Sequence, residues 1–298
     1  VKPGEAGAAM GDVSVEGAWA FQPGDDKFTD EAVLDLRYLN EKESGETGFI
    51  RLSEDGMGFV KGNGEPIRFW SAVSGPHSWS GEEMDRHCRF LAKLGVNMIR
   101  IHANVAPTRE GQRIMEVNEE GVKRIWRFVA AAKKNGIYLT VSPYWYHHRM
   151  PGSWDLAGYE KGDMPTGALF FNEKFQKAYK GWLAALYNPV NPHTGLALKD
   201  DPTVAICQVK NEDSLLFYTF KNLPPEQKRI LGRMYAQWAA KKYGSLAKAI
   251  DAWDGHTVDG DDPRNSILGF EINWYMTQDI TGGREKRVND QLRFLAAV

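Results

Sequence analysis

The sequence predicts an α/β fold of the (β/α)8 barrel type with parallel strands, present as about four β/α units. Between residues 66 and 212, short apolar runs of strand length alternate with amphipathic stretches of helix length. Parallel strands joined by right-handed helical crossovers produce this alternation. The fourth apolar run ends abruptly in Asn211-Glu212, and barrels of this type carry their functional groups at the carboxyl ends of their strands. No further run of comparable quality follows, so we expect an incomplete barrel.

Three segments are predicted along the chain. Residues 1–10 are rich in Gly and Ala and are expected to be flexible. Residues 11–65 contain short alternating runs separated by turn signals, which indicate a β-rich lead-in. Residues 66–298 are expected to form the N-terminal part of the barrel.

Apolar spacing predicts the elements of the barrel segment. In the first helix the apolar side chains of Met84, Cys88 and Leu91 recur at helical spacing, and Gly95 ends the pattern. Helices are predicted at 82–94, 118–134, 172–187, 225–243, 245–253 and 284–297. Strands are predicted at 67–70, 96–101, 137–141 and in the run that ends at Asn211.

Composition excludes several classes of function. A net charge of -2 with mixed signs gives no electrostatic basis for binding nucleic acid or an anionic membrane. The sequence has no run of about 18 apolar residues, so no membrane span is predicted. Cys88 and Cys207 fall on a predicted helix and a predicted buried strand. We expect them to be free thiols that act as small apolar residues.

The end of the fourth apolar run supplies the first catalytic candidate. Polar residues commonly mark the exit from a strand, so an Asn-Glu pair alone is weak evidence. Its context includes Phe170-Phe171-Asn172 and residues 191–196, and together they resemble the clan of barrel glycoside hydrolases that includes the family 5 cellulases and mannanases. The resemblance covers residues 30–298. It implies that Glu212 is the acid/base and that Asn211 donates a hydrogen bond to a sugar hydroxyl.

The resemblance also bears on the second catalytic group. Arg100 matches the second-strand Arg that supports the family's nucleophile through a charge-assisted hydrogen bond, although an ion pair at the barrel rim is an alternative. That nucleophile is a Glu at the end of the seventh strand, which this chain lacks. Glu271 and Glu285 are the later carboxylates, and both fall in predicted helix or loop. The nucleophile is therefore expected beyond Val298 or on another chain, or else the chain is inactive.

Aromatic and histidine residues near the predicted strand ends are candidates for binding sugar. Aromatic rings stack on the C–H faces of sugars, with core packing as the alternative. The family often has a sugar-binding His after the third strand, where this chain has Tyr144-Trp145. The resemblance therefore implies a sugar-binding position here, but with a different type of side chain. Adjacent histidines without a third ligand give little support for a metal, and we expect neither metal nor cofactor. The candidates are His102, Tyr144, Trp145, His147, His148, Trp70, Trp79 and Trp154.

These inferences predict a retaining glycoside hydrolase that cleaves a β-linked glycan such as mannan or glucan. Its partner is an oligo- or polysaccharide, and such a substrate implies an extracellular or periplasmic location. A non-catalytic carbohydrate-binding protein or an inactive barrel fragment is the alternative. A metal-dependent hydrolase on the same fold would need a His/Asp/Glu cluster at the strand ends. Because an open barrel leaves unpaired strand edges, a second chain or second copy is a further candidate partner.

Overall fold

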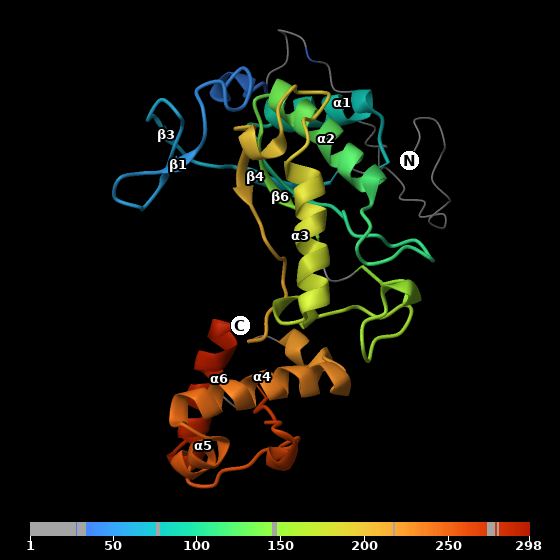
Figure 1. Cartoon of the computed structure of the whole chain (residues 1–298). Coiled ribbons are helices and arrows are strands. Elements are labelled where there is room, and N and C mark those ends of the chain that lie inside the picture. Colours follow the sequence, from blue (N-terminus) through green and yellow to red (C-terminus); the bar gives the residue numbers. More distant parts are fainter. Residues whose placement is uncertain are drawn as a thin grey trace, which may run out of the picture.

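The computed structural model describes residues 28, 34–75, 78–144, 148–216, 218–272, 278 and 280–298. Figure 1 shows two lobes. One lobe, called the β/α lobe here, contains the strands and helices up to β7, and the other, the helical lobe, contains α4, α5 and α6. The predicted flexible segment, residues 1–10, lies outside the described residues.

The β/α lobe is built on a sheet of four parallel strands in the order β4-β5-β6-β7. The strands are β4 (Ser71–Ser74), β5 (Met98–His102), β6 (Tyr138–Ser142) and β7 (Val204–Cys207). A helix separates each strand from the next in sequence. Sequential parallel strands with intervening helices are the units of a (β/α)8 barrel. The chain thus forms an incomplete α/β barrel, as predicted.

Each helix of the β/α lobe begins at a capping side chain. Ser80 and Glu83 form a reciprocal capping box at the start of the first helix, and Asn118 and Asn172 accept backbone N–H groups at the starts of the next two. The helices are α1 (Gly81–Lys93), α2 (Glu119–Lys134) and α3 (Glu173–Tyr187). Their bounds confirm the predicted helices to within one residue.

Alternation along the strands separates two faces of the sheet. Ile99 and Ile101 of β5 are fully buried in the hydrophobic core, as are Leu139 and Val141 of β6. The intervening side chains point to the opposite face, because successive residues of a strand alternate. On β4 this inner face is open, and Val73 is 69% exposed. In a closed barrel that face would be interior, so its exposure follows from the incomplete sheet.

A second, small antiparallel sheet precedes the barrel and projects from the β/α lobe (Figure 1). Its strands are β1 (Arg51–Leu52), β2 (Phe59–Val60) and β3 (Pro66–Ile67). Most of this sheet lies within residues 11–65, where a β-rich segment was predicted. The predicted strand at 67–70 is wrong, however, because Ile67 pairs with Phe59 and the first barrel strand begins at Ser71. Two short strands separated by residues 68–70 gave one continuous apolar pattern.

The two cysteines are free, as predicted, and lie in different environments. Cys88 lies on the buried face of α1, and burial raises the pKa of its thiol to about 12. Cys207 is exposed, so its predicted burial is wrong. The reason is that β7 is the last strand of the sheet and has a neighbour on one side among the described strands.

The helical lobe follows β7 and has an aromatic core. Tyr235 stacks on Trp253, Phe270 and Phe294 at centroid distances of 4.9–5.9 Å. The helices are α4 (Pro225–Tyr243), α5 (Leu246–Ala252) and α6 (Gly282–Ala297), which confirms the predicted helices to within two residues. No strand follows β7 within the described part of the chain.

Short 3-10 helices complete the described secondary structure. They span Arg37–Leu39, Gly152–Trp154, Ala168–Phe170, Leu198–Asp200, Tyr218–Asn222 and Pro263–Asn265. Among the residues that the structure describes, no helix combines the length and apolar character needed to cross a membrane.

Replacing two helical glycines by alanine should change the free energy of unfolding in opposite directions. A Cβ at Gly121 in α2 would overlap the carbonyl oxygen of Asn104, whereas a Cβ at Gly181 in α3 meets no atom within 4 Å. Overpacking costs about 1–3 kcal/mol, while Ala gains about 1 kcal/mol over Gly in an open helix. We therefore expect Gly121→Ala to lower and Gly181→Ala to raise the free energy of unfolding in urea titrations. Stabilisation by both substitutions would contradict the close approach of Asn104.

Candidate active site

The carboxyl ends of β5 and β7 bring polar side chains together on the open face of the sheet. The Nε of Arg100 donates to Oε1 of Gln208 at 3.0 Å, and its Nη2 donates to Oδ1 of Asn211 at 2.5 Å. Gln208 Nε2 also donates to Oδ1 of Asn211, at 3.2 Å. The structure thus joins two of the three predicted catalytic residues. The third, Glu212, is the next residue along the chain.

Glu212 combines an exposed side chain with an unusual backbone. Its φ is +46°, in the left-handed region, whereas the adjacent Asn211 is 2% exposed. Left-handed backbone is disfavoured for a residue with a long side chain and often marks a functional position. The buried amide and the exposed carboxylate therefore have different surroundings although they are neighbours in sequence.

His102 belongs to the same group of side chains. It lies two residues after Arg100 on β5 and thus on the same face of the sheet. Partial burial lowers the pKa of His102, the positive charge of Arg100 lowers it further, and the negative charge of Glu212 opposes both. The charges of Arg100 and Glu212 therefore both act on the His102 imidazole.

Lys210 and Asp213 flank Asn211-Glu212 and were missed in the sequence. Lys210 Nζ lies 3.4 Å from Asp213 Oδ2 and 4.2 Å from the ring centroid of Tyr144. Both oxygens of Asp213 accept the N–H of Gly167 at 3.0 Å. Burial lowers the pKa of Lys210 to about 8, although Asp213 partly opposes the shift. The i,i+3 spacing of Lys and Asp was a visible signal, but charged residues at a strand exit are usually solvated.

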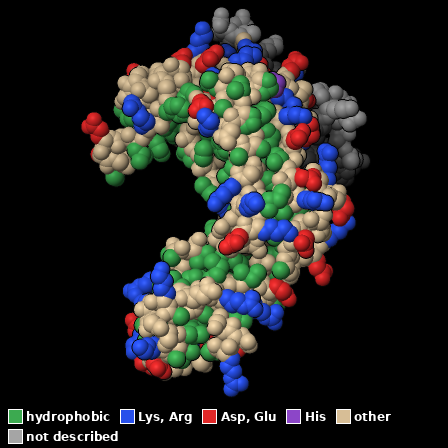
Figure 2. All heavy atoms as spheres, viewed as in Figure 1, with side chains coloured by type: hydrophobic (Ala, Val, Ile, Leu, Met, Phe, Trp, Pro, Cys, Tyr) green, Lys and Arg blue, Asp and Glu red, His purple; other side chains and the backbone are tan. Residues whose placement is uncertain are grey.

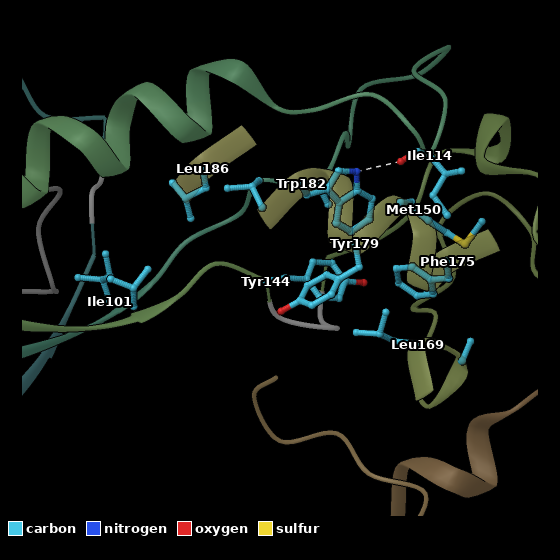
Figure 3. Packing of buried hydrophobic residues seen from close by; sticks show 14 of the residues in the cluster. Ile101, Ile114, Tyr144, Met150, Leu169, Phe175, Tyr179, Trp182 and Leu186 are labelled. Carbon is cyan, nitrogen blue, oxygen red and sulfur yellow. Dashed lines mark hydrogen bonds between the residues drawn. The ribbon is translucent and has the colours of Figure 1, made fainter. Parts of the chain in front are cut away.

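Two predicted sugar-binding aromatics lie instead in the core. Tyr144 is fully buried and packs against Phe175, Tyr179 and Trp182, as Figure 3 shows. Trp154 is 1% exposed, and its Nε1 donates to the carbonyl of Pro107 at 2.9 Å. Their prediction as sugar platforms is wrong, because both rings pack against Phe175 and Trp182 of α3 and are buried there.

Trp70 is exposed, but at the other end of the sheet. It precedes β4, and with Asn97 and Tyr138 it lines a pocket of about 350 Å³ at the amino ends of the strands. Its predicted place beside the strand ends is wrong because the first barrel strand begins after it. Trp79 does lie near the carboxyl end of β4, half-buried against the ring of His87 at 4.8 Å.

The remaining histidine and tryptophan candidates follow β6. His148 is half-buried, with its ring 6.4 Å from that of Tyr144. Trp145 and His147 lie outside the described residues. Within the described ranges, no three His, Cys, Asp or Glu side chains are arranged to hold a metal ion.

The two later carboxylates lie in the helical lobe and away from the strand ends. Glu271 contacts His256 and Arg284 at 3.1 Å each. Burial opposes the shift, but the hydrogen bonds from these two residues lower the pKa of Glu271. Glu285 is exposed in the first turn of α6. Neither carboxylate lies at a strand end beside Glu212.

No protein-family model matches this chain, and no curated protein matches it. Similar solved structures include an endo-1,4-β-mannanase from Rhizomucor miehei (14% identity, TM-score 0.46), a family 5 mannosidase from the same organism (17%, 0.42) and an endo-β-1,4-mannanase from Thermotoga petrophila (18%, 0.40). The alignments cover 75%, 73% and 61% of this chain, and 67%, 57% and 42% of those chains. The likeness is one of fold alone.

Lys210 should make stability depend on pH. Its folded pKa of about 8 lies below its ordinary value of 10.5, so between these values the unfolded chain holds a proton that the folded chain lacks. The free energy of unfolding should therefore rise with pH, by about 1.6 kcal/mol from pH 8 to 9.5. We expect this rise in wild type relative to Lys210→Met, measured by urea unfolding across that range. Parallel curves for the two proteins would show that Lys210 keeps an ordinary pKa.

Proposed function

We propose that this chain is a retaining glycoside hydrolase of the barrel type that cleaves a β-linked glycan such as mannan or glucan, with Glu212 as the acid/base. The observation that carries the proposal is the placement of Glu212. Its exposed carboxylate lies beyond the carboxyl end of the fourth parallel strand, which ends at Cys207 rather than at Asn211 as predicted, and beside an Asn211 amide that Arg100 fixes. Functional groups of barrel enzymes lie at this end of the strands.

The hydrogen bonds of Asn211 support a sugar-binding role. Its Oδ1 accepts from both Arg100 and Gln208, which sets the orientation of the amide. The Nδ2 group of the amide then remains to donate to an acceptor. A sugar hydroxyl next to the scissile bond is such an acceptor, and this kind of hydrogen bond strengthens in the transition state.

In the proposed reaction Glu212 protonates the leaving glycosidic oxygen and later activates water. A retaining mechanism also needs a nucleophilic carboxylate about 5 Å from the acid/base. Asp213 does not fill that role, because its side chain is buried and bound to Lys210 and Gly167. The proposal therefore requires a carboxylate from polypeptide that closes the barrel against the edges of β4 and β7.

The shape of the molecule supports a polymeric substrate. Figure 2 shows a surface hollowed between the β/α lobe and the helical lobe, with hydrophobic side chains along the hollow. Apolar and aromatic surfaces suit the C–H faces of sugar rings. A polysaccharide substrate would place the protein in the extracellular space or the periplasm.

A non-catalytic carbohydrate-binding protein is the second candidate. It is favoured by one observation: both later carboxylates named in the sequence, Glu271 and Glu285, lie in the helical lobe rather than at strand ends. Such a protein would use the same open face for binding without bond cleavage.

The substitution Glu212→Gln, assayed in the protein together with the polypeptide that closes its barrel, separates the two candidates. General acid–base groups contribute about 10²- to 10⁴-fold to rate, so the variant should lose turnover of manno- or cello-oligosaccharides by a factor in that range. Binding measured by calorimetry should change little because Gln keeps the shape of Glu. The control Glu120→Gln makes the same charge change in the first turn of α2 and should leave turnover intact.

Two outcomes would count against the hydrolase. Equal turnover in wild type and Glu212→Gln would remove Glu212 from catalysis. Oligosaccharide binding with no turnover in either protein would favour the carbohydrate-binding candidate.

A further inference from the structure

The segment around Glu212 is anchored at every residue except Glu212 itself. Gln208 accepts from Arg100, and the carbonyl of Val209 accepts the hydroxyl of Tyr179. Asn211 also accepts from Arg100. Lys210 and Asp213 bind each other and the core. A segment held at five of six consecutive positions leaves the sixth with little conformational choice.

Lys210 and Asp213 enclose Asn211-Glu212 between two buried side chains. The side chain of Lys210 is 6% exposed and that of Asp213 is 0% exposed, with 3.4 Å between Nζ and Oδ2. Tyr144 lies against the ammonium group, and the N–H of Gly167 binds the carboxylate. Both side chains are thus buried, whereas that of Glu212, between them in sequence, is exposed.

A buried ion pair is poor evidence for stability, because the cost of desolvating both charges offsets their attraction. A role in selecting one backbone conformation among several explains such a pair better. Here the conformation selected is an unusual one. Among the described residues, the other non-glycine positions with positive φ are Asp155, Asp254 and Ser266, whose short polar side chains tolerate it better than Glu does.

We propose that Lys210 and Asp213 are positioning residues that form a clamp, closing the turn around Asn211-Glu212 and holding Glu212 in the left-handed conformation with its carboxylate outward. The inference rests on the proposed function in giving this geometry a catalytic purpose. The clamp itself is a statement about backbone conformation. It can therefore be tested without measuring hydrolysis.

The test compares Gly with Ala at position 212 in two backgrounds. Left-handed backbone favours Gly over Ala, and right-handed or extended backbone favours Ala over Gly. Glu212→Gly and Glu212→Ala are made in the wild-type chain and in K210M/D213A, which removes both charges so that neither is left buried alone. Thermal melting by circular dichroism is recorded for all four proteins.

With an intact clamp, Glu212→Gly should melt several degrees above Glu212→Ala. In K210M/D213A the difference should vanish or reverse, because residue 212 is free to leave the left-handed region. The matched control is Asp155→Gly against Asp155→Ala, at a left-handed residue with φ +48° in a different turn. That difference should be the same in both backgrounds.

An equal Gly-to-Ala difference at position 212 in both backgrounds overturns the clamp and leaves the ion pair a merely structural contact. If K210M/D213A does not fold, Asp213→Asn replaces it. This variant keeps an acceptor for Gly167 and removes the charge, so the difference should shrink, and an unchanged difference overturns the proposal.

The outcomes also separate the clamp from the proposed function. In one outcome the Gly-to-Ala difference in melting temperature at position 212 vanishes or reverses in K210M/D213A, and Glu212→Gln leaves turnover unchanged. The clamp is then retained as a constraint on backbone conformation without a catalytic role. Loss of turnover in Glu212→Gln together with an equal Gly-to-Ala difference in both backgrounds retains the function and removes the clamp.

Discussion

One guanidinium connects two strands that are not neighbours. Arg100 lies on β5, and its partners Gln208 and Asn211 follow β7, with β6 between them. Strands two positions apart are separated by about 10 Å in a flat sheet. A side chain can bridge that distance on the inner face of a curved sheet, where neighbouring strands converge. The position of the Asn211-Glu212 turn over the sheet therefore depends on both the length of Arg100 and the curvature of the barrel.

The sequence was most informative where local signals and tertiary packing agree. The helices from α1 to α6 were predicted closely because their apolar periodicity indicates their bounds, and capping side chains at the starts of α1, α2, α3 and α5 agree with it. The strands β5 and β6 were predicted for a related reason, since both are apolar runs that follow a helix-ending Gly. Arg100 was predicted to support a nucleophile or to form an ion pair at the barrel rim, whereas its partners in the structure are the amides of Gln208 and Asn211.

The predictions were wrong where long-range packing decides whether a residue is buried and where it lies. Tyr144 and Trp154 resemble rim aromatics in sequence, and only their packing against the aromatic side chains of α3 reveals their burial. Trp70 was misplaced because two short strands appeared as one. Lys210 and Asp213 were overlooked because burial of a charge depends on what covers it, here Tyr144 and the loop at Gly167. None of these contacts is encoded within a short window of sequence.

The two cysteines lie in different environments, so their thiols should react at different rates. Cys88 is buried with a raised pKa, so it reacts slowly, whereas Cys207 is exposed at the outer edge of β7. A thiol reagent would therefore modify one position selectively without any engineered substitution. Any polypeptide that paired with β7 would cover that position, so protection of a single sulfur atom distinguishes a closed barrel from an open one.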